Sequence, residues 1–278
     1  MKPISWATLI VGGRVSWFDT KTVTLTTGAI SGASKANAEV TPYAGIVADL
    51  NGTLSAYVSF AEIFQPQSQS DAQGNLLAPR TGRQYEAGLK GSWLDGKLNA
   101  HAAVFDIKDQ NRAVTDPAAP LFSIAAGKVR SWGFETEITG EIMPNWQINA
   151  GYAYTRSEYV IATSALEGLS FRPTTPRHSA NLWTRYTIDK GLLDGVSLGA
   201  GLKSVSKFHN LSGTTRFEAA GYTIVNVQTG YRFSPHAEVT LSVNNLFDKE
   251  YYHWVNTALN GNRFGEPRSF RLTFNTRW

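Results

Sequence analysis

The side chains in this chain best suited to covalent chemistry are five histidines, His101, His178, His209, His236 and His253. A Ser–His hydrolase built on a β-strand needs its base and its nucleophile on one face, and residues on one face are spaced by two. None of the residues two positions after a histidine is a serine; they are Ala103, Ala180, Leu211, Glu238 and Val255. His178 and Ser179 are adjacent, so they point to opposite faces of a strand. The sequence therefore predicts no catalytic residues and a protein that is not an enzyme.

Metal and acid–base chemistry have equally little support in the sequence. The chain has no cysteine, and its histidines do not share the spacing that brings metal ligands together. Glu135 and Glu137 are two residues apart and would share one face of a strand. We interpret them as solvated charges and give less weight to the alternative of a catalytic carboxylate pair. We expect no metal site and no resident cofactor.

Composition excludes several classes of protein. The chain has 278 residues with 26 Lys and Arg against 22 Asp and Glu, a formal charge of +4. Its basic residues do not form a run, so nucleic acid is not an expected partner. The absence of cysteine excludes a disulfide scaffold. No apolar stretch approaches the ~18 residues that a membrane-spanning helix needs, and we expect no signal peptide at the N-terminus.

Period-2 alternation of apolar and polar residues recurs along the whole chain and predicts β-strands. The clearest case is the segment 269–278, where Phe270, Leu272 and Phe274 alternate with polar residues. Twelve segments of this kind are predicted as strands: 6–18, 42–49, 53–62, 83–93, 97–108, 129–140, 146–158, 177–187, 196–206, 221–233, 236–245 and 267–278. Five connections between them are tight. The other six are long and polar: 19–41, 63–82, 109–128, 159–176, 207–220 and 246–266.

Short and long connections alternate strictly, which in a meander puts all tight turns at one end and all long loops at the other. Transmembrane β-barrels have this asymmetry, with short periplasmic turns and long extracellular loops. The predicted fold is all-β: a transmembrane β-barrel with up-and-down antiparallel topology and about 12 strands. The alternative is a soluble β-sandwich, in which a second sheet would cover Phe270, Leu272 and Phe274.

Four separated segments resemble one known family. They are Val243-Asn244-Asn245-Leu246-Phe247-Asp248-Lys249-Glu250-Tyr251-Tyr252, Gly265-Glu266-Pro267-Arg268-Ser269-Phe270, Phe60-Ala61-Glu62-Ile63-Phe64-Gln65-Pro66-Gln67, and Gly82-Arg83-Gln84-Tyr85-Glu86-Ala87-Gly88-Leu89-Lys90-Gly91. In this order they resemble segments of TonB-dependent ferric-siderophore receptors, most closely the ferric-coprogen and ferric-pyoverdine branch. The resemblance covers essentially the whole chain.

The resemblance implies that residues 1–278 are the C-terminal part of a 22-stranded outer-membrane barrel, without the plug domain and without a signal peptide. It implies ferric-siderophore uptake, with iron carried inside the siderophore, and a fragment that does not transport on its own. The implied partners are the siderophore, outer-membrane lipid, the barrel-assembly machinery through the C-terminal strand ending at Trp278, and the TonB system only through the missing plug. The alternative is a self-contained 12-stranded outer-membrane barrel, either a porin-like channel or a phospholipase-like enzyme.

Receptors of this family resemble one another in binding siderophores with aromatic and basic groups at the extracellular mouth. Aromatic rings can stack on planar ligand groups, and arginine can bind carboxylate or hydroxamate oxygens. The matching candidates in the long connections are Phe64, Arg172, Phe208, Arg216, Tyr252, His253, Trp254 and Arg263. Trp254 is the strongest candidate, because it would share a strand face with Tyr252. The alternative for each aromatic residue is that it packs the loop.

Overall fold

The computed structural model describes residues 4–28, 30–116, 118–163, 166–212, 215–257 and 260–276. Almost all of its regular structure is β-strand, with one short 3₁₀ turn, η1 (Gly191–Leu193). Within the described residues, no helix is long and apolar enough to span a membrane. The strands are β1 (Ala7–Val23), β2 (Ile30–Asp49), β3 (Leu54–Gln65), β4 (Arg80–Trp93), β5 (Leu98–Thr115), β6 (Ser123–Met143), β7 (Trp146–Ile161), β8 (His178–Thr187), β9 (Val196–Val205), β10 (Phe208–Ser212), β11 (Thr215–Ala219), β12 (Tyr222–Ser234), β13 (Ala237–Asn244), β14 (Tyr252–Trp254), β15 (Arg263–Phe264) and β16 (Ser269–Thr276).

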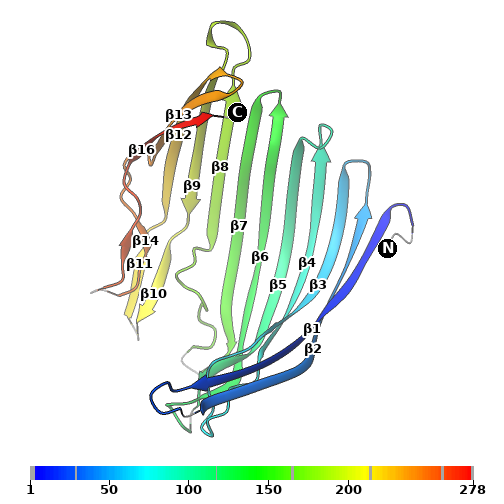
Figure 1. Ribbon diagram of the computed structural model, residues 1–278, viewed down its shortest axis with the longest axis vertical. Coiled ribbons are helices and arrows are strands. Elements are labelled where there is room, and N and C mark those ends of the chain that lie inside the picture. Colours follow the sequence, from blue (N-terminus) through cyan, green and yellow to red (C-terminus); the bar gives the residue numbers. More distant parts are fainter. Residues whose placement is uncertain are drawn as a thin grey trace. The chain divides into compact units, whose positions relative to one another are not determined.

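Twelve of these strands form one sheet in the order β1-β2-β3-β4-β5-β6-β7-β8-β9-β12-β13-β16. The two gaps in this numbering are hairpins inserted in long connections: β10–β11 lies between β9 and β12, and β14–β15 lies between β13 and β16. Neighbours in the sheet are therefore also successive along the chain, as the run of arrows in Figure 1 shows. The predicted twelve-stranded antiparallel meander is confirmed.

The long connections contain more strand than the sequence predicted. The segment 19–41 was expected to be a loop, but β1 and β2 continue through most of it, with pairs such as Thr20↔Ser34 and Lys21↔Ala33. Residues 109–115 and 123–128 likewise extend β5 and β6. The apolar residues of these extensions are mostly alanine or are irregularly spaced, so they give only a weak form of the alternation by which strands were identified. At the other end of the chain, β16 ends at Thr276, and the expected terminal aromatic Trp278 lies outside the described residues.

Two tight turns show how the sequence sets the chain reversals. At Leu94, Asp95 and Gly96 the backbone adopts φ values of 55°, 55° and 84°, the left-handed region that Asp and Gly tolerate. At Asn51 the side chain holds the turn: its Oδ1 accepts hydrogen bonds from the backbone N–H of Thr53 and of Leu54, both at 2.9 Å. Asparagine commonly stabilises turns in this way.

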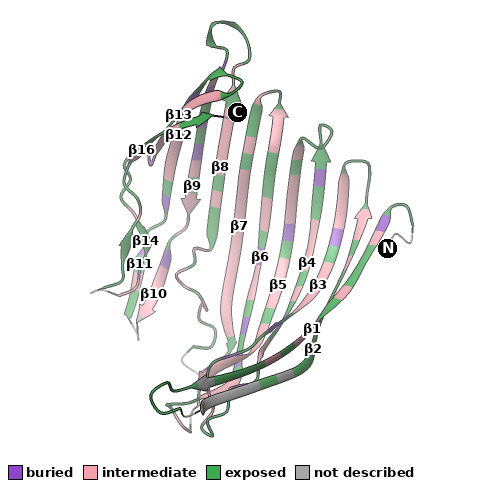
Figure 2. Cartoon of the chain, viewed as in Figure 1, coloured by how far each residue is buried: buried purple, intermediate pink, exposed green. Residues whose placement is uncertain are grey.

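The sheet has an apolar face and a polar face, and the apolar face is open. Phe270, Leu272 and Phe274 keep 69%, 73% and 65% of their surface exposed. They pair with Val243, Leu241 and Val239 of β13, which continue the same face. Figure 2 shows β16 mostly in the exposed colour. Because these side chains are not covered by a second sheet, the β-sandwich alternative is excluded.

The described chain packs as two compact units: Met1–Leu89 with Ala103–Gly133 and Arg156–Arg172, and Lys90–Ala102 with Phe134–Thr155 and Pro173–Trp278. We refer to them as unit 1 and unit 2. Unit 1 contains the long-connection ends of β3 to β7, and unit 2 contains β8 to β16. Each unit is described separately below.

Asn245 fixes the start of the long connection after β13. It is almost fully buried and adopts φ 50°. Its side-chain amide donates to the carbonyl oxygens of Lys249 (2.9 Å) and Glu266 (3.1 Å), and its Oδ1 accepts from the N–H of Lys249 (2.9 Å). Its own backbone N–H donates to Asn226 Oδ1 at 2.9 Å. The side chain thus joins the two ends of the connection to each other, and the backbone N–H of the same residue joins them to β12.

We predict that Asn245→Ala lowers the free energy of unfolding by about 1–3 kcal/mol, because buried backbone groups lose their partners and alanine is strained at this φ. The measurement is denaturant unfolding of the chain folded in detergent micelles. Asn244→Ala is the matched control, since the Asn244 amide donates a single longer bond, 3.3 Å, to Ser269 Oγ. Equal losses in the two variants would contradict this role of Asn245.

Candidate functional site

In unit 1, a polar network lies where β3, β4 and β5 enter their long connections. Alternation along β3 places Gln65 on the same face as Tyr57, and alternation along β4 places Arg80 on the same face as Glu86. Tyr57 Oη donates to Glu86 Oε1 at 2.5 Å, and Arg80 Nη1 donates to Gln65 Oε1 at 3.2 Å. This face therefore carries hydrogen-bonded polar groups up to the ends of the strands.

Two arginines share one carboxylate at this end of the sheet, and a third arginine lies against the same aromatic ring as one of them. We call this group the arginine cluster: Arg80, Arg112 and Arg172 with Asp109 and Phe171. Arg80 forms an ion pair with Asp109 Oδ2, and Arg112 Nη1 lies 2.5 Å from the same oxygen. All three of these side chains are largely buried. The guanidinium carbon of Arg112 lies 4.3 Å from the centre of the Phe171 ring, and that of Arg172 lies 5.4 Å from it.

The position of Phe171 is set by the end of β7. The Phe171 N–H donates to the carbonyl oxygen of Ser157 at 3.1 Å, and the N–H of Tyr159 donates to that of Leu169 at 3.0 Å. The Tyr159 and Phe171 rings pack edge to face with centres 5.3 Å apart. The segment 166–172 thus folds back on β7 and carries the Phe171 ring to Arg112.

Gln67 holds the connection between β3 and β4 against β5. This buried side chain donates from Nε2 to the carbonyl oxygens of Ala78 (2.6 Å) and Asn111 (2.7 Å). Its Oε1 accepts from the N–H of Ala113 at 3.1 Å. Every polar atom of the amide is used, so the ends of the loop are fixed beside the arginine cluster.

In unit 2, the two inserted hairpins share a small hydrophobic core. Its buried residues are Phe208, Ala219, Tyr222 and Val255, with Val205, Ile224 and Tyr251 packed around them. Burial raises the pKa of Tyr251. Asn210 Nδ2 of β10 also donates to the Asn256 carbonyl oxygen at 2.7 Å. The two hairpins are therefore joined by apolar contact and by a hydrogen bond.

Three exposed aromatic residues on β14–β15 form a surface that we call the aromatic patch: Tyr252, Trp254 and Phe264. The rings of Tyr252 and Phe264 are stacked with centres 4.6 Å apart. Trp254 is 43% exposed, and its neighbour across the hairpin is Arg263. Exposed rings fixed on a packed hairpin are suited to stacking on a flat ligand group.

The face of β10–β11 that points away from the core is charged. Glu218 lies between two cations, with Lys207 Nζ at 3.2 Å and Arg216 Nη2 at 2.6 Å. His209 pairs with Glu218 across the hairpin. The pKa of His209 is lowered, mainly because the ring is partly buried and secondarily because Arg216 is close.

The structure separates the predicted ligand residues into exposed and buried groups. Phe64 is 8% exposed and packs on Phe18, and Phe208 is 4% exposed in the hairpin core, so both fit the packing alternative. Arg216, Tyr252, His253, Trp254 and Arg263 lie on the two hairpins of unit 2, whereas Arg172 belongs to the arginine cluster of unit 1. Their contact with ligand stays a prediction.

Sequence reasoning missed Arg80, Asp109, Arg112, Phe171 and Phe264. The sequence did contain one indication of this site. Gln65 is the last residue of β3 and Arg80 is the first residue of β4, so the long connection between these neighbouring strands begins and ends at two residues that lie side by side. The positions of Phe171 and Phe264 depend on how the connections fold, and no periodicity indicates this.

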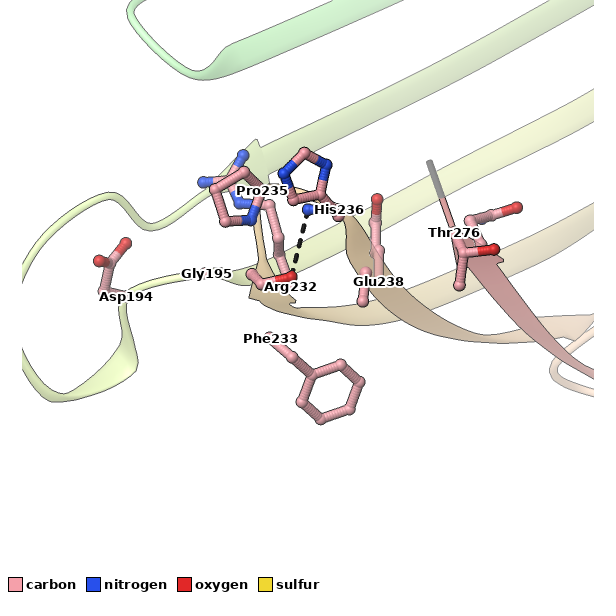
Figure 3. Close-up of a pocket in the computed structure, with 11 residues that line it drawn as sticks. Asp194, Gly195, Arg232, Phe233, Pro235, His236, Glu238 and Thr276 are labelled. Carbon is pink, nitrogen blue, oxygen red and sulfur yellow. Dashed lines mark hydrogen bonds between the residues drawn. The ribbon is translucent and has the colours of Figure 1, made fainter. Parts of the chain in front are cut away.

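Two hollows in unit 2 lie on the strands themselves. One, of about 830 Å³, is open and lies at the tight-turn end, between the β12–β13 turn and the end of β16. Figure 3 shows the Phe233 ring on the opposite side of this turn from the imidazole of His236. The backbone N–H of His236 donates to Ser234 Oγ at 3.2 Å. The other, about 330 Å³, includes Glu135 and Glu137, which share one face as predicted. In the part of the chain described, no group of three acidic, histidine or cysteine side chains is arranged to hold a metal.

Comparison with known proteins connects this fold to a family. The family model "TonB dependent receptor-like, beta-barrel" matches residues 3–246. The chain belongs to this family. It is 38% identical over 277 residues to the ferric-pyoverdine M114 receptor PbuA of Pseudomonas sp. (strain M114), and 34% identical over 253 residues to the ferripyoverdine receptor of Pseudomonas aeruginosa.

A solved structure agrees with the family assignment. The pyoverdine outer membrane receptor FpvA of Pseudomonas aeruginosa PAO1, bound to pyoverdine, superposes with a TM-score of 0.86 at 30% identity over 99% of this chain and 40% of that one. The two sequence relatives match 96% and 85% of this chain but 33% and 30% of their own lengths. The chain thus spans about a third of these relatives, and its family is that of bacterial outer-membrane receptors. The resemblance seen in the sequence is confirmed.

We predict that the β10–β11 hairpin loses stability as the pH falls below 6.5. Because the pKa of His209 is lowered by folding, the unfolded hairpin takes up a proton more readily than the folded hairpin. The stability of the hairpin is therefore complete above pH 6.5, the pKa of the unfolded state, and is lost as the pH falls toward the lower pKa of the folded state. Hydrogen exchange of the hairpin amides, corrected for intrinsic rates, should become faster between about pH 7 and about pH 5. His209→Gln should remove this pH dependence and His253→Gln should retain it; the reverse result would contradict the assignment to His209.

Proposed function

We propose that this chain supplies twelve strands of the barrel of an outer-membrane receptor that takes up ferric siderophores. The observation that carries the proposal is the similarity to ferric-pyoverdine receptors along almost the whole chain. The architecture is compatible with it: one face of the sheet is apolar and open to lipid, and the other is polar, as expected inside a wide barrel. Iron would enter as the ferric siderophore and would not be ligated by the protein.

In this proposal, transport needs more than these 278 residues. The plug and the segment that meets TonB would be supplied outside them, and the C-terminal strand would be the part read by the barrel-assembly machinery. Outer-membrane lipid would cover the apolar face that includes Phe270, Leu272 and Phe274, because exposed apolar side chains of this size are otherwise costly in water.

We further propose that the receptor binds its ligand without catalysing a reaction. His178, the histidine next to a serine, donates its backbone N–H to Ser206 Oγ at 3.1 Å, and its ring Nδ1 lies 2.8 Å from Tyr152 Oη. These contacts place the imidazole beside tyrosine side chains, and they give the phospholipase-like alternative no support. The aromatic patch offers what binding requires instead: exposed rings on a packed hairpin.

Trp254→Ala should weaken binding of ferric pyoverdine by at least about fivefold, close to the ~1 kcal/mol typical of a buried contact residue at an interface. The ligand should cover this exposed ring, so the loss should reflect lost stacking. Affinity can be followed by quenching of tryptophan fluorescence in the chain folded in micelles and, in parallel, in receptor-containing outer membranes.

Trp17→Ala is the matched control, because Trp17 is an equally large exposed indole on β1. It should leave the affinity unchanged. If Trp254→Ala bound ferric pyoverdine with an affinity within about twofold of that of the unsubstituted protein, Trp254 would not be part of the binding surface. Absence of ferric-pyoverdine binding in both preparations of the unsubstituted protein would contradict the choice of ligand.

A further inference from the structure

We propose that Asn260 and Gly261, in the connection between β14 and β15, form a site of spontaneous covalent modification, at which Asn260 loses its side-chain amide and becomes aspartate or isoaspartate. The proposal goes beyond the proposed function and does not depend on it, because the reaction needs no ligand and no partner protein. It divides the two Asn-Gly pairs of the chain into a stable pair, Asn51-Gly52, and a reactive pair, Asn260-Gly261.

The reaction uses groups that are adjacent in the chain, with water as the only co-reactant. The backbone nitrogen of Gly261 attacks the side-chain carbonyl carbon of Asn260, and the new C–N bond closes a succinimide ring. The bond from that carbon to the side-chain nitrogen breaks, and the nitrogen leaves as ammonia with the proton from the Gly261 N–H. Water then opens the ring at either carbonyl carbon, which gives aspartate or isoaspartate. In total, an amide NH₂ is replaced by OH.

The first argument is the freedom of the attacking nitrogen. Glycine has no Cβ, so its nitrogen is unhindered and the backbone can rotate toward the geometry of the ring. Within the described residues the N–H of Gly261 makes no hydrogen bond, so no contact has to break before the attack. Asn260 and Gly261 are both exposed, so water reaches the ring that it must open.

The second argument is the weak hold on the Asn260 side chain. Its Oδ1 accepts a hydrogen bond from Thr257 Oγ1 at 3.3 Å, and its Nδ2, the leaving nitrogen, donates none within the part of the chain that is described. The backbone of Asn260 is held by the same threonine, whose Oγ1 accepts from the Asn260 N–H at 3.2 Å. The backbone is therefore restrained, whereas the side chain can turn toward Gly261.

The third argument is the contrast with the other Asn-Gly pair. Asn51 and Gly52 are also exposed, and both pairs follow a leucine in the sequence. Asn51 Oδ1, however, accepts three hydrogen bonds: from the N–H of Thr53 at 2.9 Å, from Thr53 Oγ1 at 3.0 Å and from the N–H of Leu54 at 2.9 Å. These bonds fix the orientation of the side chain, and turning it toward the Gly52 nitrogen would break them. The tight turn therefore protects Asn51.

The modification changes the hairpin that carries the aromatic patch. Isoaspartate adds a methylene to the backbone, and this disturbs the turn in which the Thr257 N–H and Oγ1 donate to the Asn260 carbonyl oxygen at 3.3 Å and 3.1 Å. Either product also introduces a negative charge three residues before Arg263. The protein therefore exists in covalent forms that differ in charge and backbone length at β14–β15.

The test follows both Asn-Gly pairs in one sample of the full chain folded in micelles. The protein is kept in H₂¹⁸O at mildly alkaline pH, and the peptide that contains each pair is analysed by mass spectrometry over time. Uptake of ¹⁸O marks the conversions that take place during the incubation. We expect Asn260 to be converted at least about tenfold faster than Asn51, which corresponds to ~1.4 kcal/mol.

Two controls separate the fold from the local sequence. In denaturant neither side chain is held, so the two pairs should react at rates within about twofold of each other. Asn260→Gln keeps an amide at this position but would have to close a larger ring. This variant should lose the conversion at residue 260 and keep the slow conversion of Asn51.

Equal rates for the two pairs in the folded protein, or no conversion of Asn260, would overturn the proposal. Aspartate without isoaspartate would also overturn it, because a succinimide ring opens to both products. A difference in denaturant as large as that in the folded protein would assign the reactivity to the sequence and would contradict the protective role of the Asn51 turn. None of these results would affect the proposed function.

Discussion

The structure depends on one constraint: each strand inside the sheet must hydrogen-bond both of its neighbours while its two faces meet different surroundings. Side chains alternate between the faces, so a shift of one residue in any pair would exchange apolar for polar side chains. The register from Val243↔Phe270 to Val239↔Phe274 keeps apolar residues opposite one another, and the pair Glu238↔Asn275 stays on the polar face. The exposure of Phe270, Leu272 and Phe274 follows from this register, since the sheet satisfies its own backbone and leaves one face for lipid.

The same constraint explains how far the sequence alone predicts the fold. Strands with one apolar face, such as β13 and β16, are identified almost completely from the sequence. The different surroundings of their two faces require apolar and polar residues to alternate, and this alternation is visible in the sequence. Where β1 and β2 pair as Thr20↔Ser34 and Lys21↔Ala33, the residues are polar or small, so the alternation is weak although the strands still pair. The hairpin β10–β11 is missed for a related reason: it is short, and only the pairing of Phe208 with Ala219 faces a core.

The candidate sites are less predictable from the sequence. A residue's type indicates which interactions its side chain can form, but not whether that side chain points to the surface or into the loop. Phe64 and Trp254 are both aromatic residues in or near long connections, yet Phe64 packs on Phe18 and Trp254 is exposed. Phe64 lies within the continuous strand β3, whereas Trp254 follows an interruption at Asn245, whose φ is 50°. Such residues redirect the chain that follows, and the asparagine type permits the interruption without specifying it.

Two sets of ion pairs on the polar face differ in their charge balance. Near the tight turns, Arg185 Nη2 of β8 donates to Glu238 Oε1 of β13 at 2.5 Å and to Ser197 Oγ at 2.9 Å. It passes over Gly230, where an added Cβ would lie 2.6 Å from that hydroxyl oxygen. One arginine and one glutamate balance each other, so this pair joins strands and needs no further ion. At the long-connection end, Arg80 and Arg112 share the single carboxylate of Asp109, and Arg172 lies against the Phe171 ring. Two guanidinium groups on one carboxylate leave a partly buried positive charge that this carboxylate alone does not balance, so the two ends of the polar face differ in charge although both are held by arginine–carboxylate pairs.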